Sequence, residues 1–466
     1  MSAASVTPLP PPAPPPGFYA AAEKIYPRET RGRFARLRQA AVVALLGLFY
    51  GLAWLQWNGH QALLFDLPAR KFHVFGLTLW PQDFLYLALL LIIAALSLFF
   101  FTALAGRLWC GFACPQTVWT ELFIWIEQWT EGPRARRMKL DRGPWTVAKI
   151  VRKGGKQLLW VALAAYTGFT FVGYFVPIRT LGAQIASLTV GPWAAFWMFL
   201  YSLATYGNAG FLREQVCKYM CPYARFQSAM FDRDTLIISY DAQRGEPRGA
   251  RRRGSAARAQ GLGDCIDCTL CVQVCPTGID IRRGLQYECI ACGACIDACD
   301  DVMDKMASPR GLIRYTTENA LSGRTTHVLR PRMLVYGALL GAGVVVLLVS
   351  LFTRTPLILD VIRDRNALYR EVSGDRIENA YTLKVINLDD RPHSYRLAVS
   401  GMSRLELVAP LAPIGAAPGS VSTVPARLQA PASFAGGVHR ITLSLTAVDA
   451  PRIAVREKAR FIGPQS

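Results

Sequence analysis

Histidine is scarce in this chain of 466 residues, whose five histidines are His60, His73, His327, His393 and His439. None of them lies in a long apolar run. A transmembrane b-type haem takes axial histidines from within the bilayer, so this distribution argues against a diheme quinol-oxidising core. The sequence also lacks a P-loop and a Gly-rich dinucleotide fingerprint, which leaves a nucleotide-driven pump without support.

Lys and Arg are absent from five long apolar stretches, although the chain contains 52 of these residues against 32 acidic ones. The stretches are 40–57, 81–105, 157–177, 191–211 and 334–352. Each approaches the ~20 apolar residues that a helix needs to cross a bilayer. The sequence therefore predicts an α-helical membrane protein with about five transmembrane helices.

Basic residues are distributed unevenly between the segments that join these stretches. The short segments 58–80 and 178–190 hold few of them, whereas 1–39, 106–156 and 212–333 are strongly basic. By the positive-inside rule, the basic segments face the cytoplasm of a bacterial inner membrane, and the C-terminal region lies in the periplasm. The net charge of +20 is then a matter of topology. We expect these basic residues to lie next to membrane lipid, and we do not expect the protein to bind nucleic acid.

The chain divides into five predicted parts. Residues 1–39 form a Pro-rich, basic and disordered N-terminus, and 40–215 contain transmembrane helices 1–4. Residues 216–333 form a cytoplasmic module, and 334–352 form transmembrane helix 5. Residues 353–466 show short runs of alternating apolar and polar residues separated by turn signals, which predicts a β-sandwich.

Aromatic and acidic residues are mixed in the stretch 112–129. Trp119, Trp125 and Trp129 suit the headgroup region of a membrane, and Glu121 and Glu127 make a deep crossing costly. We expect an interfacial helix here. A sixth span is the alternative, and the basic loop that follows argues against it.

All twelve cysteines fall into four clusters, and eight of them form two CxxCxxCxxxC motifs. This is the spacing of a two-cluster bacterial ferredoxin, in which each fourth cysteine ligates the other cluster. The predicted ligands of one [4Fe–4S] cluster are Cys265, Cys268, Cys271 and Cys299, and those of the other are Cys289, Cys292, Cys295 and Cys275. A pair of zinc knuckles is the alternative that the doubled motif disfavours. Nearby acidic residues should lower the potential of one cluster; they are Asp297, Asp300, Asp301 and Asp304.

The other four cysteines form a repeated CxxxCP motif, Cys110 with Cys114 and Cys217 with Cys221. On a helix, residues i and i+4 share a face, and the proline that follows would stop or kink the helix. Four thiolates near the cytoplasmic membrane face would suit a soft ion such as Cu(I), or a further iron–sulfur centre. A packing role, or a thiol pair without metal, is the alternative.

The sequence resembles the CcoG family, also called FixG or RdxA, the accessory proteins of cytochrome c oxidase. The resemblance rests on both CxxxCP motifs, the two ferredoxin motifs from Gly263 to Cys299, and the run Pro309–Tyr315. In the C-terminal region it rests on Arg365–Tyr369 and Glu378–Asn387. The resemblance implies an immunoglobulin-like fold for the C-terminal sandwich.

The resemblance also implies a function, the assembly of a high-affinity cbb3-type oxidase through reduction of Cu(II) to Cu(I). Copper is then the substrate, and the expected partners are oxidase assembly factors, copper-transporting proteins and a cytoplasmic electron donor. Cys110, Cys114, Cys217 and Cys221 would form the copper or redox site. Two alternatives stay open: a membrane ferredoxin relay for a quinol dehydrogenase, similar to NapH or NosR, and a scaffold without enzymatic activity.

Overall fold

The computed structural model describes residues 24–253, 261–364, 367–389 and 391–464. The chain folds into two compact units, each assembled from separate stretches of sequence. The first comprises the described parts of Met1–Leu45, Thr102–Leu163 and Ala204–His327, and the second comprises Leu46–Phe101, Ala164–Leu203 and the described parts of Val328–Ser466. The Pro-rich start, predicted to be disordered, lies largely outside the described residues.

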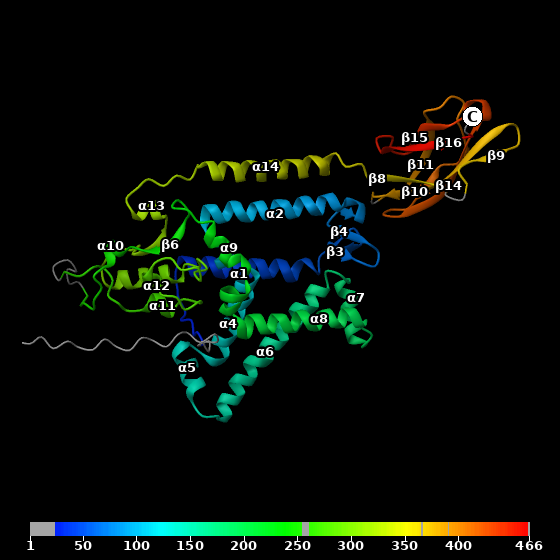
Figure 1. Ribbon diagram of the computed structural model, residues 1–466. Coiled ribbons are helices and arrows are strands. Elements are labelled where there is room, and N and C mark those ends of the chain that lie inside the picture. The colour runs from blue at the N-terminus through cyan, green and yellow to red at the C-terminus, as the bar shows by residue number, and fades with distance from the viewer. Residues whose placement is uncertain (1–23, 254–260, 365–366, 390, 465–466) are drawn as a thin grey trace, which may run out of the picture. The chain divides into compact units, whose positions relative to one another are not determined.

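The first unit contains many short helices around one small sheet. Its two strands, β6 (Ile237–Tyr240) and β7 (Ile313–Thr316), pair in antiparallel fashion. Figure 1 shows β6 among the helices α10, α11 and α12. The helical segments are α3 (Leu108–Phe112), α4 (Pro115–Glu131), α5 (Arg134–Arg142), η2 (Tyr206–Leu212), η3 (Val216–Met220), α9 (Pro222–Ala229), α10 (Ala242–Gly245), α11 (Leu270–Gln273), η5 (Ile281–Arg283), α12 (Ala294–Lys305) and α13 (Glu318–Leu321).

Three helices are long and apolar enough to cross a membrane in the described part of the chain. They are α1 (Arg33–Leu52), the continuous helix Pro81–Ala105, formed by η1 (Pro81–Asp83) and α2 (Phe84–Ala105), and α14 (Pro331–Phe352). The helix α1 begins at Arg33, within the segment predicted to be disordered up to residue 39. A residue far away in sequence holds this first turn in place. The Asp297 carboxylate accepts hydrogen bonds from the backbone N–H groups of Phe34 and Ala35.

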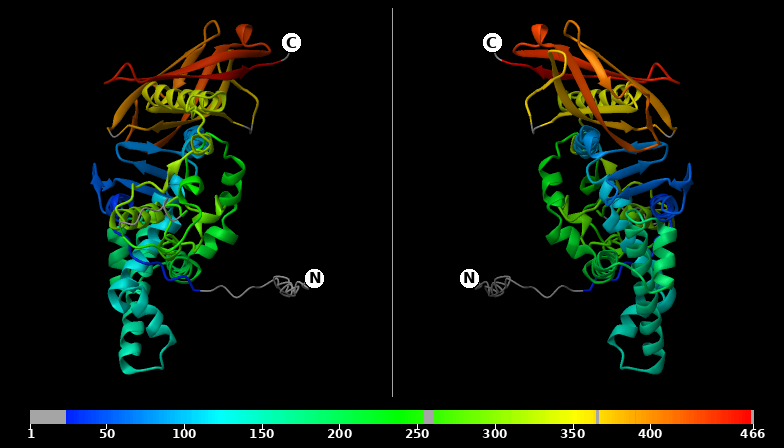
Figure 2. Two further views of the ribbon diagram at one scale, coloured as in Figure 1. Left: turned by 90° about the vertical axis from the view of Figure 1, so that its left-hand side faces the viewer. Right: turned by 90° about the vertical axis from the view of Figure 1, so that its right-hand side faces the viewer.

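The two other predicted spans have a different form. The helix α6 (Val147–Val172) starts ahead of the predicted span 157–177 and includes four basic residues in its first turns. Figure 2 shows these turns beside α5, where Lys153 pairs with Asp141. The helix α8 (Pro192–Thr205) has only 14 residues before the chain widens into the π-helical segment η2. The number of membrane crossings therefore stays a prediction.

The remaining elements of the second unit are mainly strands. A small meander, β3 (Leu63–Asp66), β4 (Lys71–Val74) and β5 (Leu77–Leu79), follows the pair β1 (Gln56–Trp57) and β2 (His60–Gln61). One further helix, α7 (Ile178–Ala186), precedes α8.

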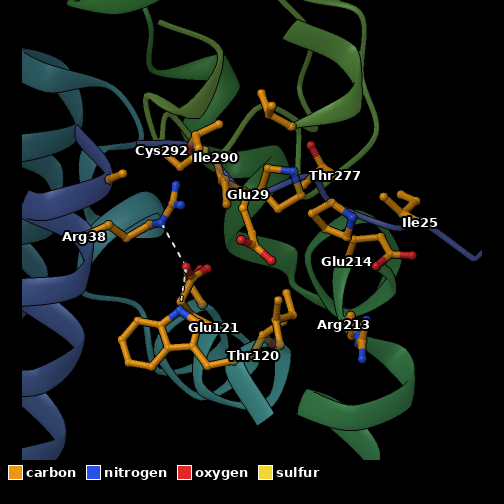
Figure 3. A pocket seen from close by; sticks show the side chains of 18 of the residues that line it. Ile25, Glu29, Arg38, Thr120, Glu121, Arg213, Glu214, Thr277, Ile290 and Cys292 are labelled. Carbon is orange, nitrogen blue, oxygen red and sulfur yellow. Dashed lines mark hydrogen bonds and ion pairs between the residues drawn. The ribbon is translucent and has the colours of Figure 1, made fainter. Parts of the chain in front are cut away.

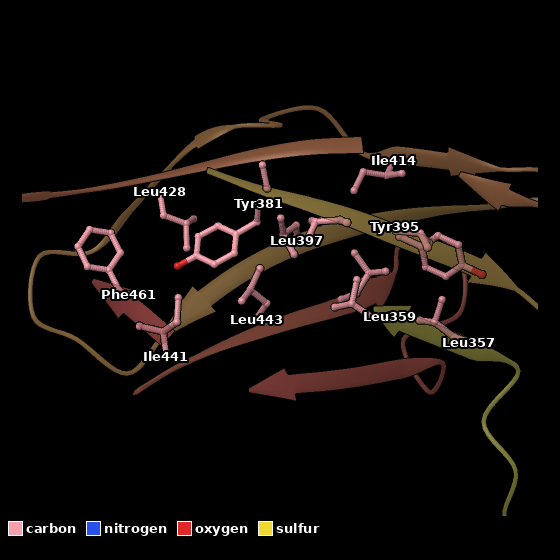
Figure 4. Packing of buried hydrophobic residues seen from close by; sticks show 14 of the residues in the cluster. Leu357, Leu359, Tyr381, Tyr395, Leu397, Ile414, Leu428, Ile441, Leu443 and Phe461 are labelled. Carbon is pink, nitrogen blue, oxygen red and sulfur yellow. The ribbon is translucent and has the colours of Figure 1, made fainter. Parts of the chain in front are cut away.

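The C-terminal region is a sandwich of two antiparallel sheets. One sheet has the order β12-β14-β10-β8 with β9 beside β10, and the other has the order β13-β11-β15-β16. Alternate residues face inward, and Figure 4 shows Tyr381, Leu397 and Leu443 packed between the sheets. This confirms the predicted β-sandwich. The strands are β8 (Leu357–Arg363), β9 (Arg370–Val372), β10 (Arg376–Asn387), β11 (His393–Ser400), β12 (Glu406–Ala409), β13 (Ile414–Ala416), β14 (Val421–Pro431), β15 (Val438–Ala447) and β16 (Ala454–Ile462), with a short turn of helix, η6 (Ala432–Phe434).

Candidate iron–sulfur and thiol site

Two small cavities in the first unit are lined by the eight cysteines of the ferredoxin motifs. One cavity is lined by Cys265, Cys268, Cys271 and Cys299. The other is lined by Cys275, Cys289, Cys292 and Cys295, with Cys271 also at its wall. The spacing of the motifs predicts the same two sets of four. Apolar side chains from β6, η5, α12 and β7 fill the space around both cavities.

The backbone takes the same path around the second cysteine of each motif. Asp267 and Thr269 flank Cys268 with φ angles of 54° and 56°. Ala291 and Gly293 flank Cys292 with φ angles of 53° and 75°. This left-handed conformation is uncommon for residues other than glycine. Its repetition indicates that both loops curl around their cavity in the same way, which brings three closely spaced cysteines to one wall.

The arrangement of the thiols fits a multi-iron cluster better than a single ion. In the described part of the chain, no three His, Cys, Asp or Glu side chains are placed to share one metal ion, and this holds for the ferredoxin cysteines and the four CxxxCP cysteines alike. Four thiols distributed around an apolar cavity suit a [4Fe–4S] cluster, which takes one cysteine at each iron. The geometry therefore disfavours the zinc-knuckle alternative.

The acidic residues near the second motif are all bonded to other parts of the protein. Asp297 caps α1, and Asp300 accepts a hydrogen bond from the N–H of Gly311 at 2.9 Å. Asp301 pairs with Lys305, and Asp304 pairs with Arg310 at 2.6 Å. Because each charge is shared with a donor, the predicted lowering of a cluster potential should be smaller than the four charges alone suggest.

The two CxxxCP motifs have the same local structure. Cys110 lies in α3 and Cys217 in η3, whereas Cys114 and Cys221 are the N-cap residues of α4 and α9. The proline after each second cysteine is the first residue of the next helix. The helix that carries the first cysteine ends before this proline, as the motif predicts, and in both motifs the proline then begins the next helix, a position where its missing N–H costs nothing.

The four CxxxCP thiols lie near one another and are largely buried. Burial raises the pKa of Cys110 to about 12, and the neighbouring thiols of Cys114, Cys217 and Cys221 raise it further than Arg107 lowers it. Burial likewise raises the pKa of Cys217 to about 11. The thiols of Cys110, Cys114 and Cys217 are therefore protonated in the metal-free protein at neutral pH, and a bound soft metal has to displace their protons.

Arg107 joins the CxxxCP motifs to the ferredoxin module, and sequence analysis did not single it out. Its side chain is 4% exposed and donates to the backbone carbonyls of Ala224 and, at 3.5 Å, of Cys289. It is also close enough to Cys110, Cys217 and Cys221 for electrostatic interaction. The one feature of the sequence that could have drawn attention to Arg107 is that it is a single arginine just after the apolar stretch 81–105.

A close backbone approach brings the first CxxxCP motif against the second cavity. A Cβ atom on Gly111 would lie 2.7 Å from the carbonyl oxygen of Ile290 and 2.8 Å from that of Ala291. Cys110 packs against the apolar group that contains Ile290 and Cys292. Only glycine permits this contact, which places a CxxxCP thiol next to a predicted cluster ligand.

Comparison with known proteins supports an iron–sulfur assignment. Residues 212–318 match a 4Fe-4S dicluster domain, and residues 87–137 match a 4Fe-4S binding domain. Residues 347–464 match the Ig-like fold at the C-terminus of FixG. Both CxxxCP motifs thus lie within regions that match iron–sulfur families.

The chain is also similar to curated proteins over most of its length. It is 40% identical to the nitrogen fixation protein FixG of Rhizobium meliloti, over 83% of this chain and 80% of that protein. It is 42% identical to the protein RdxA of Cereibacter sphaeroides, over 83% of this chain and 84% of that protein. The ferredoxin-type protein NapH of Haemophilus influenzae is 24% identical over 59% of this chain and 88% of its own length. Given the two cysteine-lined cavities and this extent of identity, the chain belongs to the FixG/RdxA family of iron–sulfur proteins.

Proposed function

We propose that this protein is a multi-pass electron-transfer protein of the bacterial inner membrane that reduces Cu(II) to Cu(I) for the assembly of a cbb3-type oxidase. The observation that carries the proposal is the contact of a CxxxCP thiol with the loop that lines the second cavity. It provides a short route from an electron store to a soft, thiol-rich site. On this proposal, the ferredoxin module is cytoplasmic and the β-sandwich is periplasmic.

The residues of this chain have distinct tasks in the proposed reaction. Cys265, Cys268, Cys271 and Cys299 would hold one [4Fe–4S] cluster, and Cys275, Cys289, Cys292 and Cys295 the other. Such clusters, when bound, supply one-electron transfer. The apolar side chains around both cavities shield most of these cysteines from water, whereas Cys268 is exposed.

The CxxxCP thiols would act on the substrate. Copper enters as Cu(II), gains one electron and leaves as Cu(I), and thiolate ligands favour the Cu(I) product. Since the thiols of Cys110 and Cys217 are protonated before copper binds, the buried Arg107 guanidinium beside them stabilises the thiolates that copper binding creates. The partners on this proposal are a cytoplasmic electron donor, copper-transporting proteins and oxidase assembly factors.

Cupric reduction by the purified, cluster-loaded protein tests the proposal. The protein is reduced, mixed with Cu(II), and assayed with a Cu(I)-specific chelator and by EPR of both copper and clusters. We expect one Cu(I) for each electron lost, and a marked loss of rate in Cys110→Ser and Cys217→Ser variants that keep their iron. Unchanged rates in these variants would remove the copper site from the four thiols.

A ferredoxin relay is the second candidate, favoured by the similarity to NapH and by the match of residues 87–137 to a 4Fe-4S binding domain. In that case the CxxxCP cysteines would hold a further cluster, and the iron content would exceed that of two [4Fe–4S] clusters. A protein that is redox-silent towards copper and quinone analogues but still binds the oxidase would instead be a scaffold.

A further inference from the structure

A cavity of about 520 Å³ lies in the first unit, separate from the two cysteine-lined cavities. Its walls come from residues 25–31, from α1, from α4, from the start of η3 with Cys217, and from the loops that carry Thr277 and Cys292. Ligand pockets of proteins commonly have volumes of ~300–1,000 Å³. The cavity is thus large enough for a small organic molecule, and it touches both a proposed cluster ligand and a CxxxCP cysteine.

A buried ion pair lies in the wall of this cavity. Arg38 of α1 and Glu121 of α4 are 3.5 Å apart, with side chains 12% and 17% exposed. The Nε of Arg38 is the atom that faces Glu121 Oε1, and this buried contact is too long to be a well-formed hydrogen bond. Figure 3 shows the guanidinium between Glu121 on one side and Cys292 with Ile290 on the other. The guanidinium is thus held only by a long ion pair, and a ligand oxygen in the cavity can complete its bonding.

The remaining walls suit an uncharged, partly apolar ligand. Apolar surface comes from Ile25, Ala35, Val43, Ile124 and Trp125, and uncharged polar groups come from Gln116, Thr120 and Gln128. The buried cations at the wall already have anionic partners, since Arg38 pairs with Glu121 and Arg213 pairs with Glu127 at 2.7 Å. Arg28 and Arg31 also line the cavity, but both are exposed, so the remaining positive charge lies at its rim and not in its interior.

The cavity is also placed for a ligand that dissolves in lipid. One wall belongs to α1, which is among the three helices apolar enough to span a membrane. Val43 on that helix lines the cavity and is 64% exposed. A molecule with an apolar ring system and polar oxygens at its ends matches both the walls and this route of entry.

We propose that this cavity binds a ligand of the quinone–hydroquinone class, which donates electrons to the proposed copper reduction in place of a cytoplasmic donor. Oxidation of a bound hydroquinone to the quinone breaks two O–H bonds and releases two electrons and two protons. The two proposed clusters can accept one electron each, and the Glu121 and Glu29 carboxylates can pass the protons to water. The electron step rests on the proposed function, but ligand binding does not.

Photoaffinity labelling of the full-length, cluster-loaded protein tests the site directly. The probe is a short-chain azidoquinone, competed by the same quinone without the azide, and mass spectrometry locates the label. We expect labelled peptides from residues 25–43 and 116–128. Thr120→Trp fills the cavity and should reduce labelling about tenfold or more, because a lost pocket removes both packing and hydrogen bonds. Thr130→Trp is the matched control on the same helix and should label like the parent.

The cluster absorbance of each variant shows whether it has folded. If Thr120→Trp loses its clusters, Glu121→Gln replaces it, since this change keeps the shape of the wall and removes the anion that orients Arg38. Equal labelling in parent and filled or neutralised variants, or label confined to other peptides, would overturn the proposal. If the label shows no quinone site but the dithionite-reduced protein still reduces Cu(II), the copper function is supported and the quinone site is not. If labelling is specific but no copper is reduced, only the quinone site is supported.

Discussion

His393 of the C-terminal sandwich has a carboxylate at each ring nitrogen. Its Nδ1 lies 2.6 Å from Asp449 Oδ2, and its Nε2 lies 3.0 Å from Asp389 Oδ2. Burial lowers the pKa of the imidazole, but the two hydrogen-bonded carboxylates outweigh this effect, and the net pKa is raised. The folded state therefore binds the proton more tightly than the unfolded chain, whose histidine pKa is about 6.5.

The sign of the pH dependence follows from this raised pKa. The stabilising contribution is fully present below about pH 6.5 and is lost as the pH rises through the folded-state value. We expect amide exchange of β11 and β15, corrected for intrinsic rates, to become faster as the pH rises through this window. His393→Gln should remove that dependence, whereas His439→Gln should not, because the His439 Nε2 lies 2.8 Å from a backbone carbonyl oxygen, that of Gly436, and not from a carboxylate. Identical pH profiles in the two variants would contradict the assignment.

Individual residues differ in how far their role can be predicted from the sequence. The eight cysteines lie in a local motif whose spacing alone predicts the two groups found around the cavities. By contrast, Asp297 caps α1 although it lies 263 residues after Phe34 in the chain. Its place in the sequence beside the ferredoxin cysteines predicts a different role, the lowering of a cluster potential. Arg107 is similar, since its partners on α9 and near Cys289 are distant in sequence. Such roles depend on tertiary contacts that no local pattern encodes.

At the scale of elements, the contact of α3 with the loop after Cys289 depends on Gly111. An added methyl group would lie within 3.0 Å of two backbone carbonyl oxygens, which cannot rotate away. Overpacking of this kind typically costs ~1–3 kcal/mol. We expect Gly111→Ala to lose mainly the cluster of the second cavity, measured as lower iron content and loss of one EPR component. Gly154→Ala is the control, since no atom lies within 4 Å of the added Cβ.

The helices α4, α5 and α6 are joined by a buried network of ion pairs. Glu127 of α4 is fully buried and pairs with Arg137 at 3.4 Å and Arg213 at 2.7 Å. Glu131, also fully buried, pairs with Lys156 at 2.9 Å. The sequence predicts α4 as an interfacial helix, but it offers no sign that its two last carboxylates face inward to basic residues from other elements.

Neutralising Glu127 should destabilise the first unit strongly. In Glu127→Gln, two buried guanidinium groups lose their common anion, and breaking a buried pair in this way typically costs ~3–5 kcal/mol. We expect a lower thermal midpoint for the purified protein in detergent. Glu318→Gln should change it little, because the carboxylate of Glu318 is 63% exposed. Similar midpoints for the two variants would show that the network contributes little to stability.

At the scale of the whole molecule, the sequence predicts the C-terminal β-sandwich that the structure shows, whereas the number of membrane crossings stays a prediction. Alternation of apolar and polar residues identifies the sandwich because its strands are amphipathic. Apolar runs identify α1, α2 and α14, but hydropathy says nothing about where a helix starts or changes its pitch. For that reason α6 extends into a basic segment and α8 gives way to π-helical turns, neither of which the run of apolar residues reveals.

The termini cannot distinguish three crossings from five, because either odd number places the sandwich opposite the ferredoxin module. The side of the membrane on which the segment between α7 and α8 lies does distinguish the two numbers. If α6 and α8 both cross the membrane, Ser187 lies on the periplasmic side; if neither does, it lies with the ferredoxin module in the cytoplasm. Ser187 is exposed, as are Ser322 near the end of the first unit and Ser373 in the sandwich. Serine-to-cysteine variants at these three positions therefore give a matched set.

Labelling of spheroplasts with a membrane-impermeant maleimide reads out this difference. The positive-inside pattern predicts that Ser373→Cys is labelled in intact spheroplasts and that Ser322→Cys is labelled only after lysis. Five crossings further predict that Ser187→Cys behaves like Ser373→Cys, since the segment 178–190 is poor in basic residues. Labelling of Ser187→Cys only after lysis would reduce the crossings to three. The basic first turns of α6 would then belong to a helical pair that packs against the cytoplasmic module without entering the bilayer.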